Sequence, residues 1–139
     1  MNFNKLILLL IITFGTLLSC TIDDDDTPTI AGAWQVKNIS GGLAGIDDTY
    51  TQGTIKWTFN SQNFTLTVVN NNPLNTTIYD GFAPGIYSYS ITKNNDSSYL
   101  VIEGNEFGES TLTVQNLIIN QNKLSTGTGN DGFILKLER

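Results

Sequence analysis

The sequence predicts an all-β fold: an antiparallel up-and-down barrel of eight or nine strands, in one domain at residues 30–139. Three observations lead to this prediction. Apolar and polar residues alternate in several runs after residue 30, and no stretch has a helical period of useful length. The runs are rich in β-branched and aromatic residues, which strands favour. Clusters of Asn, Asp, Ser and Gly separate them. Such a meander forms a barrel or a sandwich, and we favour the barrel because closure removes exposed strand edges.

The first strand is expected at residues 31–36, and the clearest hairpin follows at residues 55–68. Alternate side chains of a strand point to opposite faces, so each strand of this hairpin should present three apolar residues to the interior. In order along the chain they are Ile55, Trp57, Phe59, Phe64, Leu66 and Val68. The dipeptide Ser61-Gln62 breaks the alternation, and the turn is expected there.

The second half of the domain continues the meander. Tyr87, Tyr89 and Ile91 alternate with polar residues, and a turn cluster at residues 93–97 leads to a return strand at residues 99–103. Leu100 and Ile102 fall on one face of that return strand. Further strands are expected at residues 111–119, 123–126 and 133–138, with a turn at residues 120–122.

Residues 1–19 are predicted to be a signal peptide that is removed. One positive charge, Lys5, precedes a 13-residue uncharged stretch at residues 6–18, as in secretory signals. A helix of that length spans roughly 20 Å, which is too short for a hydrocarbon core about 30 Å thick. An uncleaved anchor or an apolar core helix is the alternative, but the four aspartates at positions 23–26 cannot continue a buried helix.

The chain has one cysteine, Cys20, and it ends the sequence Leu17-Leu18-Ser19-Cys20. This motif resembles the lipobox of bacterial lipoproteins. The resemblance implies that the Cys20 thiol carries a diacylglycerol with chains such as palmitate, and that the mature protein begins at Cys20. Two or three acyl chains give stable membrane anchoring. Without the lipid, a lone cysteine in an exported protein would be a reactive thiol.

Residues 20–29 are expected to form a tether between the lipid and the domain. Acidic runs are usually solvated, and self-repulsion extends them. Cys20-Thr21-Ile22 followed by four aspartates also resembles the surface-export signal of lipoproteins from the Bacteroidota. That resemblance implies an outer-membrane protein displayed on the cell surface. A lipoprotein that faces the periplasm is the alternative.

Composition excludes several classes of function. The sequence contains no histidine, and Cys20 is assigned to the lipid. Ser-His-Asp catalysis, Cys-His catalysis and a Cys/His zinc site are therefore excluded. From residue 30 onward, six basic residues face nine acidic ones, so no basic patch for nucleic acid is expected. Only carboxylate catalysis or calcium-type oxygen ligation remains open. We expect a protein that is not an enzyme and needs no cofactor or metal.

Acidic residues are expected in loops, where they would be solvated: Asp47, Asp48, Glu103, Glu106, Glu109 and Asp131. Glu106 and Glu109 flank Gly108, and a calcium-binding loop is the alternative for this segment. The spacing does not match the ligand pattern of an EF-hand.

The opening Ala31-Gly32-Ala33-Trp34 has the Gly-x-Trp pattern of lipocalins, and the meander that follows it resembles short lipocalin-like domains of secreted and lipid-anchored bacterial proteins. The hairpin at residues 55–68, the strand at residues 85–91 with its return and the closing strand match the same layout. The resemblance implies that Gly32 and Trp34 plug one end of the barrel. It also implies that Arg139, or alternatively Lys136, packs over Trp34 in a structural cation–π contact.

The same resemblance implies that the barrel binds a small apolar or amphipathic molecule. The residues expected to line that site are Trp57, Phe59, Phe64, Tyr87 and Tyr89. The two tyrosines are the strongest candidates because a buried hydroxyl needs a hydrogen-bond partner. The alternative is that these side chains fill the barrel, since small barrels are about wide enough for their own side chains. The protein would then be an interaction or envelope-accessory module that binds an unidentified protein partner through its loops.

Overall fold

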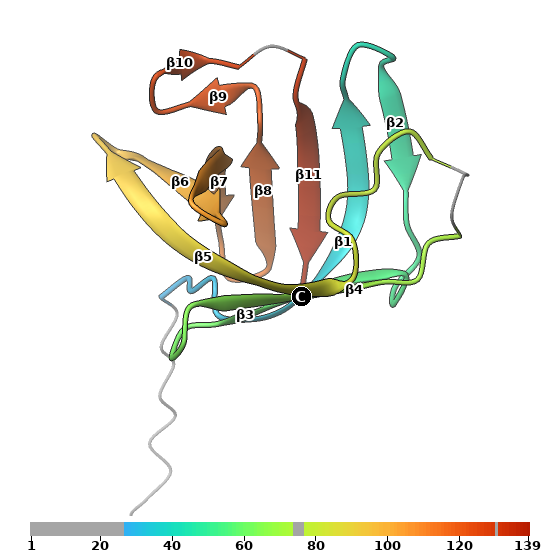
Figure 1. Ribbon diagram of the computed structural model, residues 1–139, viewed down its shortest axis with the longest axis horizontal. Helices are drawn as coiled ribbons and strands as arrows, with labels where there is room; N and C mark the ends of the chain where they lie inside the picture. The colour runs from blue at the N-terminus through green and yellow to red at the C-terminus, as the bar shows by residue number, and fades with distance from the viewer. Residues whose placement is uncertain (1–26, 74–76, 130) are drawn as a thin grey trace, which may run out of the picture.

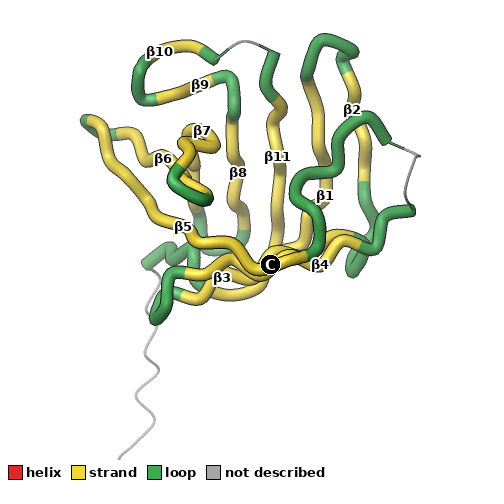
Figure 2. Tube along the Cα trace, viewed as in Figure 1, coloured by secondary structure: helices red, strands yellow, loops and turns green. Residues whose placement is uncertain are grey.

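The computed structural model describes residues 27–73, 77–129 and 131–139. Every regular element in these residues is a β-strand (Figure 2). The predicted signal peptide, Cys20 and the aspartate run lie outside the described residues. In the described part of the chain, no helix has the length and apolar character to cross a membrane.

Nine strands form one antiparallel sheet in the order β11-β8-β7-β6-β5-β4-β3-β1-β2, and β9 and β10 form a separate hairpin. The strands are β1 (Gly32–Gly41), β2 (Ile46–Thr49), β3 (Ile55–Asn60), β4 (Thr65–Asn70), β5 (Gly85–Asn94), β6 (Ser97–Ile102), β7 (Asn105–Leu112), β8 (Asn116–Asn120), β9 (Lys123–Leu124), β10 (Gly127–Thr128) and β11 (Phe133–Glu138).

The sheet closes on itself because β11 pairs with β1 as well as with β8 (Figure 1). Eight strands, namely β1, β3 to β8 and β11, therefore make a closed antiparallel barrel, and β2 is an extra strand. The prediction of an eight- to nine-stranded antiparallel barrel is confirmed, and the arrangement is consistent with a lipocalin-like barrel.

β1 has two different neighbours along one of its edges. Its first residues, Gly32 to Gln35, pair with β3, and its last residues, Asn38 to Gly41, pair with β2. A register shift between Val36 and Asn38 interrupts the ladder with β11 where the neighbour changes. Bulges of this kind bend a strand and increase its twist, so β1 can pair with β3 along its first half and with β2 along its second half.

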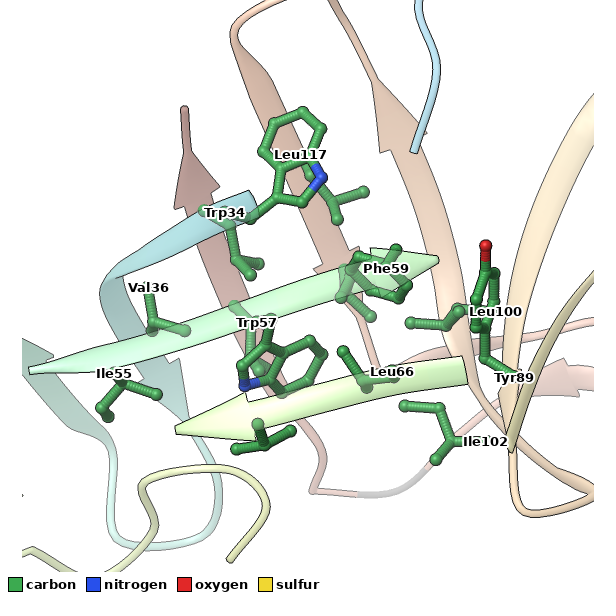
Figure 3. Close-up of a cluster of buried hydrophobic side chains, with 14 of the residues drawn as sticks. Trp34, Val36, Ile55, Trp57, Phe59, Leu66, Tyr89, Leu100, Ile102 and Leu117 are labelled. Atoms are coloured by element: carbon green, nitrogen blue, oxygen red, sulfur yellow. The ribbon is translucent and has the colours of Figure 1, made fainter. Parts of the chain in front are cut away.

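The inner face of the barrel is apolar, as the alternation predicts. Trp57 pairs with Val68 and Phe59 with Leu66 across β3 and β4. Strand residues that alternate inward from every side form one core (Figure 3). Its most completely buried side chains are Trp34, Val36, Ile39, Ile55, Trp57, Phe59, Leu66, Leu100, Leu117, Ile119, Leu135 and Leu137. Leu100 and Ile102 share the inner face, as expected.

Two predicted strands are wrong in detail. Residues 111–119 are not one strand, because the chain turns between β7 and β8, where the Thr113 amide donates to the Asn116 carbonyl oxygen at 2.8 Å. Residues 123–126 do not return along β8. Lys123 and Leu124 instead pair with β10, and the place beside β8 belongs to β11.

The acidic residues are not all in loops as predicted. Asp47 and Asp48 lie in β2, and Glu106 and Glu109 lie in β7. Gly108 is a strand residue too, and a Cβ there would come within 2.5 Å of the Asn120 carbonyl oxygen on β8. The segment around Gly108 is therefore part of a strand that lies close against the backbone of β8, and it is not a calcium-binding loop.

Candidate functional site

Four of the five residues predicted to line a ligand site face the barrel interior. Trp57, Phe59 and Tyr89 are buried, and Tyr87 is partly buried against the core. The rings contact one another: the Phe59 and Tyr89 centroids are 5.0 Å apart, and those of Trp57 and Phe59 are 6.2 Å apart. These side chains fill the middle of the barrel with aromatic contacts.

Phe64 differs from the prediction. It lies in the turn before β4 and is 60% exposed. Its φ of 55° places it in the left-handed region, where the chain reverses direction between the two strands. The inward alternation therefore begins at Leu66, and the Phe64 ring packs from outside against Tyr89, with centroids 6.2 Å apart.

One end of the barrel is closed by residues 77–84, which we call the cap. The Phe82 ring enters the barrel and contacts Trp57, Phe107 and Tyr87, at centroid distances of 5.8, 5.1 and 4.9 Å. The Tyr87 hydroxyl donates to the carbonyl oxygen of Ala83 at 2.9 Å. The hydroxyl that was expected to need a ligand is therefore satisfied by the cap.

Tyr79 connects the cap to the barrel wall through ring stacking and hydrogen bonds. Its ring stacks on Phe133 with centroids 4.1 Å apart and planes 9° apart. Gln121 donates to the Tyr79 hydroxyl at 3.1 Å, and the Tyr50 hydroxyl donates to the Tyr79 carbonyl oxygen at 3.4 Å. Burial raises the pKa of Tyr79. Burial, followed by the charges of Asp48 and Asp80, raises the pKa of Tyr50 to about 12.

Beneath the cap, the indole N–H of Trp57 has no hydrogen-bond partner among the described residues, although it is buried. An unsatisfied buried donor costs about 1–3 kcal/mol. Trp57 therefore contributes to the core through its ring contacts and not through its polar atom.

The opposite end of the barrel contains a pocket of about 500 Å³. We call it the end pocket. Its walls come from the N-terminal segment and from β5 to β8, and include the turn between β5 and β6. The lining residues are Pro28, Ile30, Ile91, Asp96, Ser97, Ser98, Glu109, Ser110, Thr111, Leu112 and Leu117. None of the five predicted ligand-lining residues is among them.

The pocket exists because neighbouring strands differ in length. The first residue of β4, Thr65, pairs with Ser88. The next amide, that of Tyr89, still donates to the Phe64 carbonyl oxygen at 2.9 Å, whereas Ser90 to Asn94 pair with β6 alone. The β5–β6 hairpin therefore extends beyond the end of β4. The N-terminal segment with Ile30 lies across the space that this leaves beside the hairpin. Ile91 on β5 is 37% exposed for the same reason.

Trp34 and Arg139 fix the N-terminal wall of this pocket. Trp34 is fully buried, and its indole N–H donates to the Ile30 carbonyl oxygen at 2.8 Å. The Arg139 guanidinium lies 4.4 Å from the centre of the Trp34 ring and donates to the carbonyl oxygens of Thr29 and Ala31. The predicted pairing of Trp34 with Arg139 is confirmed, and Arg139 rather than Lys136 makes the contact.

The outer rim of the pocket is acidic and partly neutralised. Glu109 accepts a hydrogen bond from the Ser97 hydroxyl at 2.7 Å and forms an ion pair with Lys123 at 2.9 Å. The hydrogen bond from Lys123, and then that from Ser97, lowers the pKa of Glu109. Among the described residues no three or more carboxylate, cysteine or histidine side chains are grouped so that they could hold a metal ion.

Comparison with protein-family models, with curated proteins and with solved structures finds no match to this chain.

The sequence does not single out the pocket residues. The sequence pattern places Pro28 in the tether and Ile30 at the start of the domain, and it places Leu112 and Leu117 on one continuous strand. Their meeting depends on the turn at residues 113–115 and on contacts between distant segments. The weak signal in the sequence is Ile30, an apolar residue directly before the Gly-x-Trp opening.

Proposed function

We propose that this protein is a lipid-anchored envelope protein, displayed on the outer face of the outer membrane, whose lipocalin-like barrel binds a small apolar or amphipathic molecule. The function is binding rather than catalysis. The end pocket is the observation that supports this proposal. Its volume of about 500 Å³ falls within the range of small-molecule sites, about 300–1,000 Å³.

The lining of the end pocket suits such a ligand. Ile30, Leu112 and Leu117 supply apolar surface, and Ser98 and Ser110 supply hydroxyls. Small-molecule sites combine a mainly apolar wall with a few polar groups that fix orientation. The middle of the barrel is less suited to a ligand, because aromatic rings already occupy it.

The proposed anchor would hold the end pocket near the membrane. Cys20 precedes Pro28 by eight residues. An extended chain spans at most about 3.6 Å per residue, so the pocket wall would lie within about 29 Å of the lipid. A ligand held in the membrane could reach the pocket without a long transfer through water.

A second function is favoured by the filled interior. If the end pocket binds no small molecule, the barrel serves as an interaction or envelope-accessory module with a protein partner. The exposed side chains at the capped end, Leu43 at 88% and Ile78 at 70%, would then be contact residues, because exposed apolar groups can mark interaction sites.

The decisive experiment is native mass spectrometry of the full-length protein, purified from membranes and exposed to a lipid extract. We expect a bound small molecule with the unmodified chain and its loss with Leu112→Trp, which fills the pocket. Ile118→Trp, on the outer face of β8, is the matched control and should retain the ligand. Absence of any bound molecule with the unmodified chain would favour the second function.

Anchoring and display are tested separately. Cys20→Ala should release the protein from membranes, and normal retention would refute lipidation. Protease treatment of intact cells should remove the domain. Complete protection would place the protein on the periplasmic side.

A further inference from the structure

We infer that the end pocket takes a single-chain amphiphile whose polar end is uncharged or cationic, and that it rejects anionic amphiphiles. This inference rests on the proposed binding function and adds the chemical class of the ligand. It follows from the distribution of apolar, hydroxyl and charged groups around the pocket.

The apolar part of the pocket comes from three segments of the chain. Ile30 comes from the N-terminal segment, Leu112 from the end of β7 and Leu117 from β8, where it is fully buried. A pocket of about 500 Å³ lies in the lower half of the size range for small ligands. One apolar chain therefore suits it better than the two chains of a membrane phospholipid.

Hydroxyl groups lie on the wall formed by β6 and β7. Ser98 and Ser110 are register partners, and the Ser110 hydroxyl donates to the Ser98 carbonyl oxygen at 3.2 Å. Each hydroxyl oxygen also has lone pairs that can accept hydrogen bonds. A ligand with hydroxyl or amine donors at its polar end would find acceptors here.

The charges on the lining select against anions. Asp96 and Glu109 are the ionisable residues among those that line the pocket. Lys123 neutralises Glu109, whereas Asp96 is exposed in the turn between β5 and β6. An anionic end placed at this rim would meet like charge, and such juxtapositions suppress the wrong partner.

Of the basic residues near the pocket, Lys123 is paired with Glu109 and Arg139 is bound to the N-terminal segment, so Lys93 is the residue that could reverse this selectivity. It pairs with Ser98 across β5 and β6 and is exposed, but it does not line the pocket. If its flexible side chain reached a ligand's polar end, it would favour an anion. The test must therefore include this residue.

The experiment uses the full-length lipidated protein in phosphatidylcholine vesicles, with Leu112→Cys as a reporter. Lipidation would leave the introduced cysteine as the free thiol, and its reaction rate with a water-soluble maleimide reports on pocket occupancy. The probes share a twelve-carbon chain: monolaurin is neutral, dodecyltrimethylammonium is cationic and dodecyl sulfate is anionic. All are used at concentrations that leave the barrel folded.

We expect monolaurin and dodecyltrimethylammonium to slow labelling about tenfold and dodecyl sulfate to slow it less than twofold. Asp96→Lys, added to the reporter variant, should raise protection by dodecyl sulfate. Ser90→Cys, on the outer face of β5, is the control, and its labelling should not change with any probe.

Each failure has its own signature. Equal or better protection by dodecyl sulfate would overturn the inference and leave the binding function standing, and loss of that protection in Lys93→Ala would identify the reason. Protection by none of the probes would count against both the inference and the proposed function. Maleimide labelling of Cys20 in the unmodified protein would refute the lipid anchor alone.

Discussion

The two ends of the barrel are built in different ways. At the capped end, residues 77–84 lie over the strands, and aromatic rings from distant segments pack beneath them. At the other end, the strands end at different heights, and the short N-terminal segment crosses the space between them. The capped end is sealed by side chains, whereas the other end keeps a pocket of about 500 Å³.

This difference shows how a small barrel can be well packed in the middle and still keep a pocket at one end. Interiors of proteins are close-packed, so a barrel of eight short strands has little room to hold a molecule at its centre. A cavity at one end of the barrel should destabilise the fold less than a cavity at its centre, because only the ends of the strands lose packing contacts there. The mismatch between β4 and β5 creates that space while the aromatic core stays intact.

Replacement of Trp57 should give the largest effect. Trp57→Ala removes a fully buried ring that contacts Phe59, Phe82 and Phe107. Truncation of a buried Trp or Phe typically costs about 3–5 kcal/mol, so we expect a loss of that size in the free energy of unfolding, measured by urea denaturation.

Trp57→Phe separates ring packing from the polar atom. The lost volume is smaller, and the indole N–H has no partner to lose. We therefore expect it to cost clearly less than Trp57→Ala. Equal losses for the two variants would contradict this expectation, because they would mean that the Phe ring restores none of the packing of the Trp57 ring.

A smaller loss of stability at the capped end is expected in alkaline solution. The pKa values of Tyr50 and Tyr79 are raised in the folded state, to about 12 for Tyr50, from an ordinary value of 10.0. Between these values the unfolded chain releases phenolic protons that the folded chain retains, so the free energy of unfolding should fall as the pH rises.

Urea denaturation at pH 8, 10 and 11 measures this dependence. Below pH 10, Tyr50 and Tyr79 should cause no change in the free energy of unfolding with pH. Above pH 10, Tyr50→Phe should show a smaller fall in that free energy than the unmodified protein. A fall of the same size in Tyr50→Phe would assign the effect to other groups.

Arg139→Ala should give the smallest effect on stability and should act on the pocket end. A cation–π contact contributes about 0.5–1 kcal/mol at exposed sites, and the variant also loses two hydrogen bonds to the N-terminal segment. We expect a loss of about 1 kcal/mol and faster proteolysis within residues 27–31, measured by mass spectrometry of the fragments.

Lys136→Ala is the matched control for Arg139→Ala. Lys136 is an exposed basic residue of β11, the strand that ends directly before Arg139, and its replacement should leave both stability and proteolysis unchanged. Equal proteolysis in the two variants would show that Arg139 does not hold the pocket wall.

Strand alternation was sufficient to predict the barrel wall. Trp57, Phe59, Leu66 and Leu100 follow the period of two and face inward as expected, because each belongs to a strand with one buried face. The pairing of Trp34 with Arg139 was also accessible, since the Gly-x-Trp opening resembles a known pattern.

The closure of the two ends was not accessible from periodicity. Phe82 and Tyr79 belong to an irregular segment, and their burial depends on partners far away in the chain, such as Phe107 and Phe133. The turn at residues 113–115 lies within a run of strand-forming residues. It is stabilised by local hydrogen bonds between Thr113 and Asn116, a pattern too short to separate from a continuous strand.

The short strand β2 has a consequence for the proposed anchoring of many copies on one membrane. It is the last strand in the sheet order, and its outer edge has no strand partner among the described residues. Such an edge could recruit a strand from a neighbouring molecule and begin aggregation. β2 has only four residues, and two of them are Asp47 and Asp48. Two copies meeting edge to edge would bring four carboxylates together, and under the proposed lipid anchoring this repulsion would keep neighbouring copies from joining their sheets.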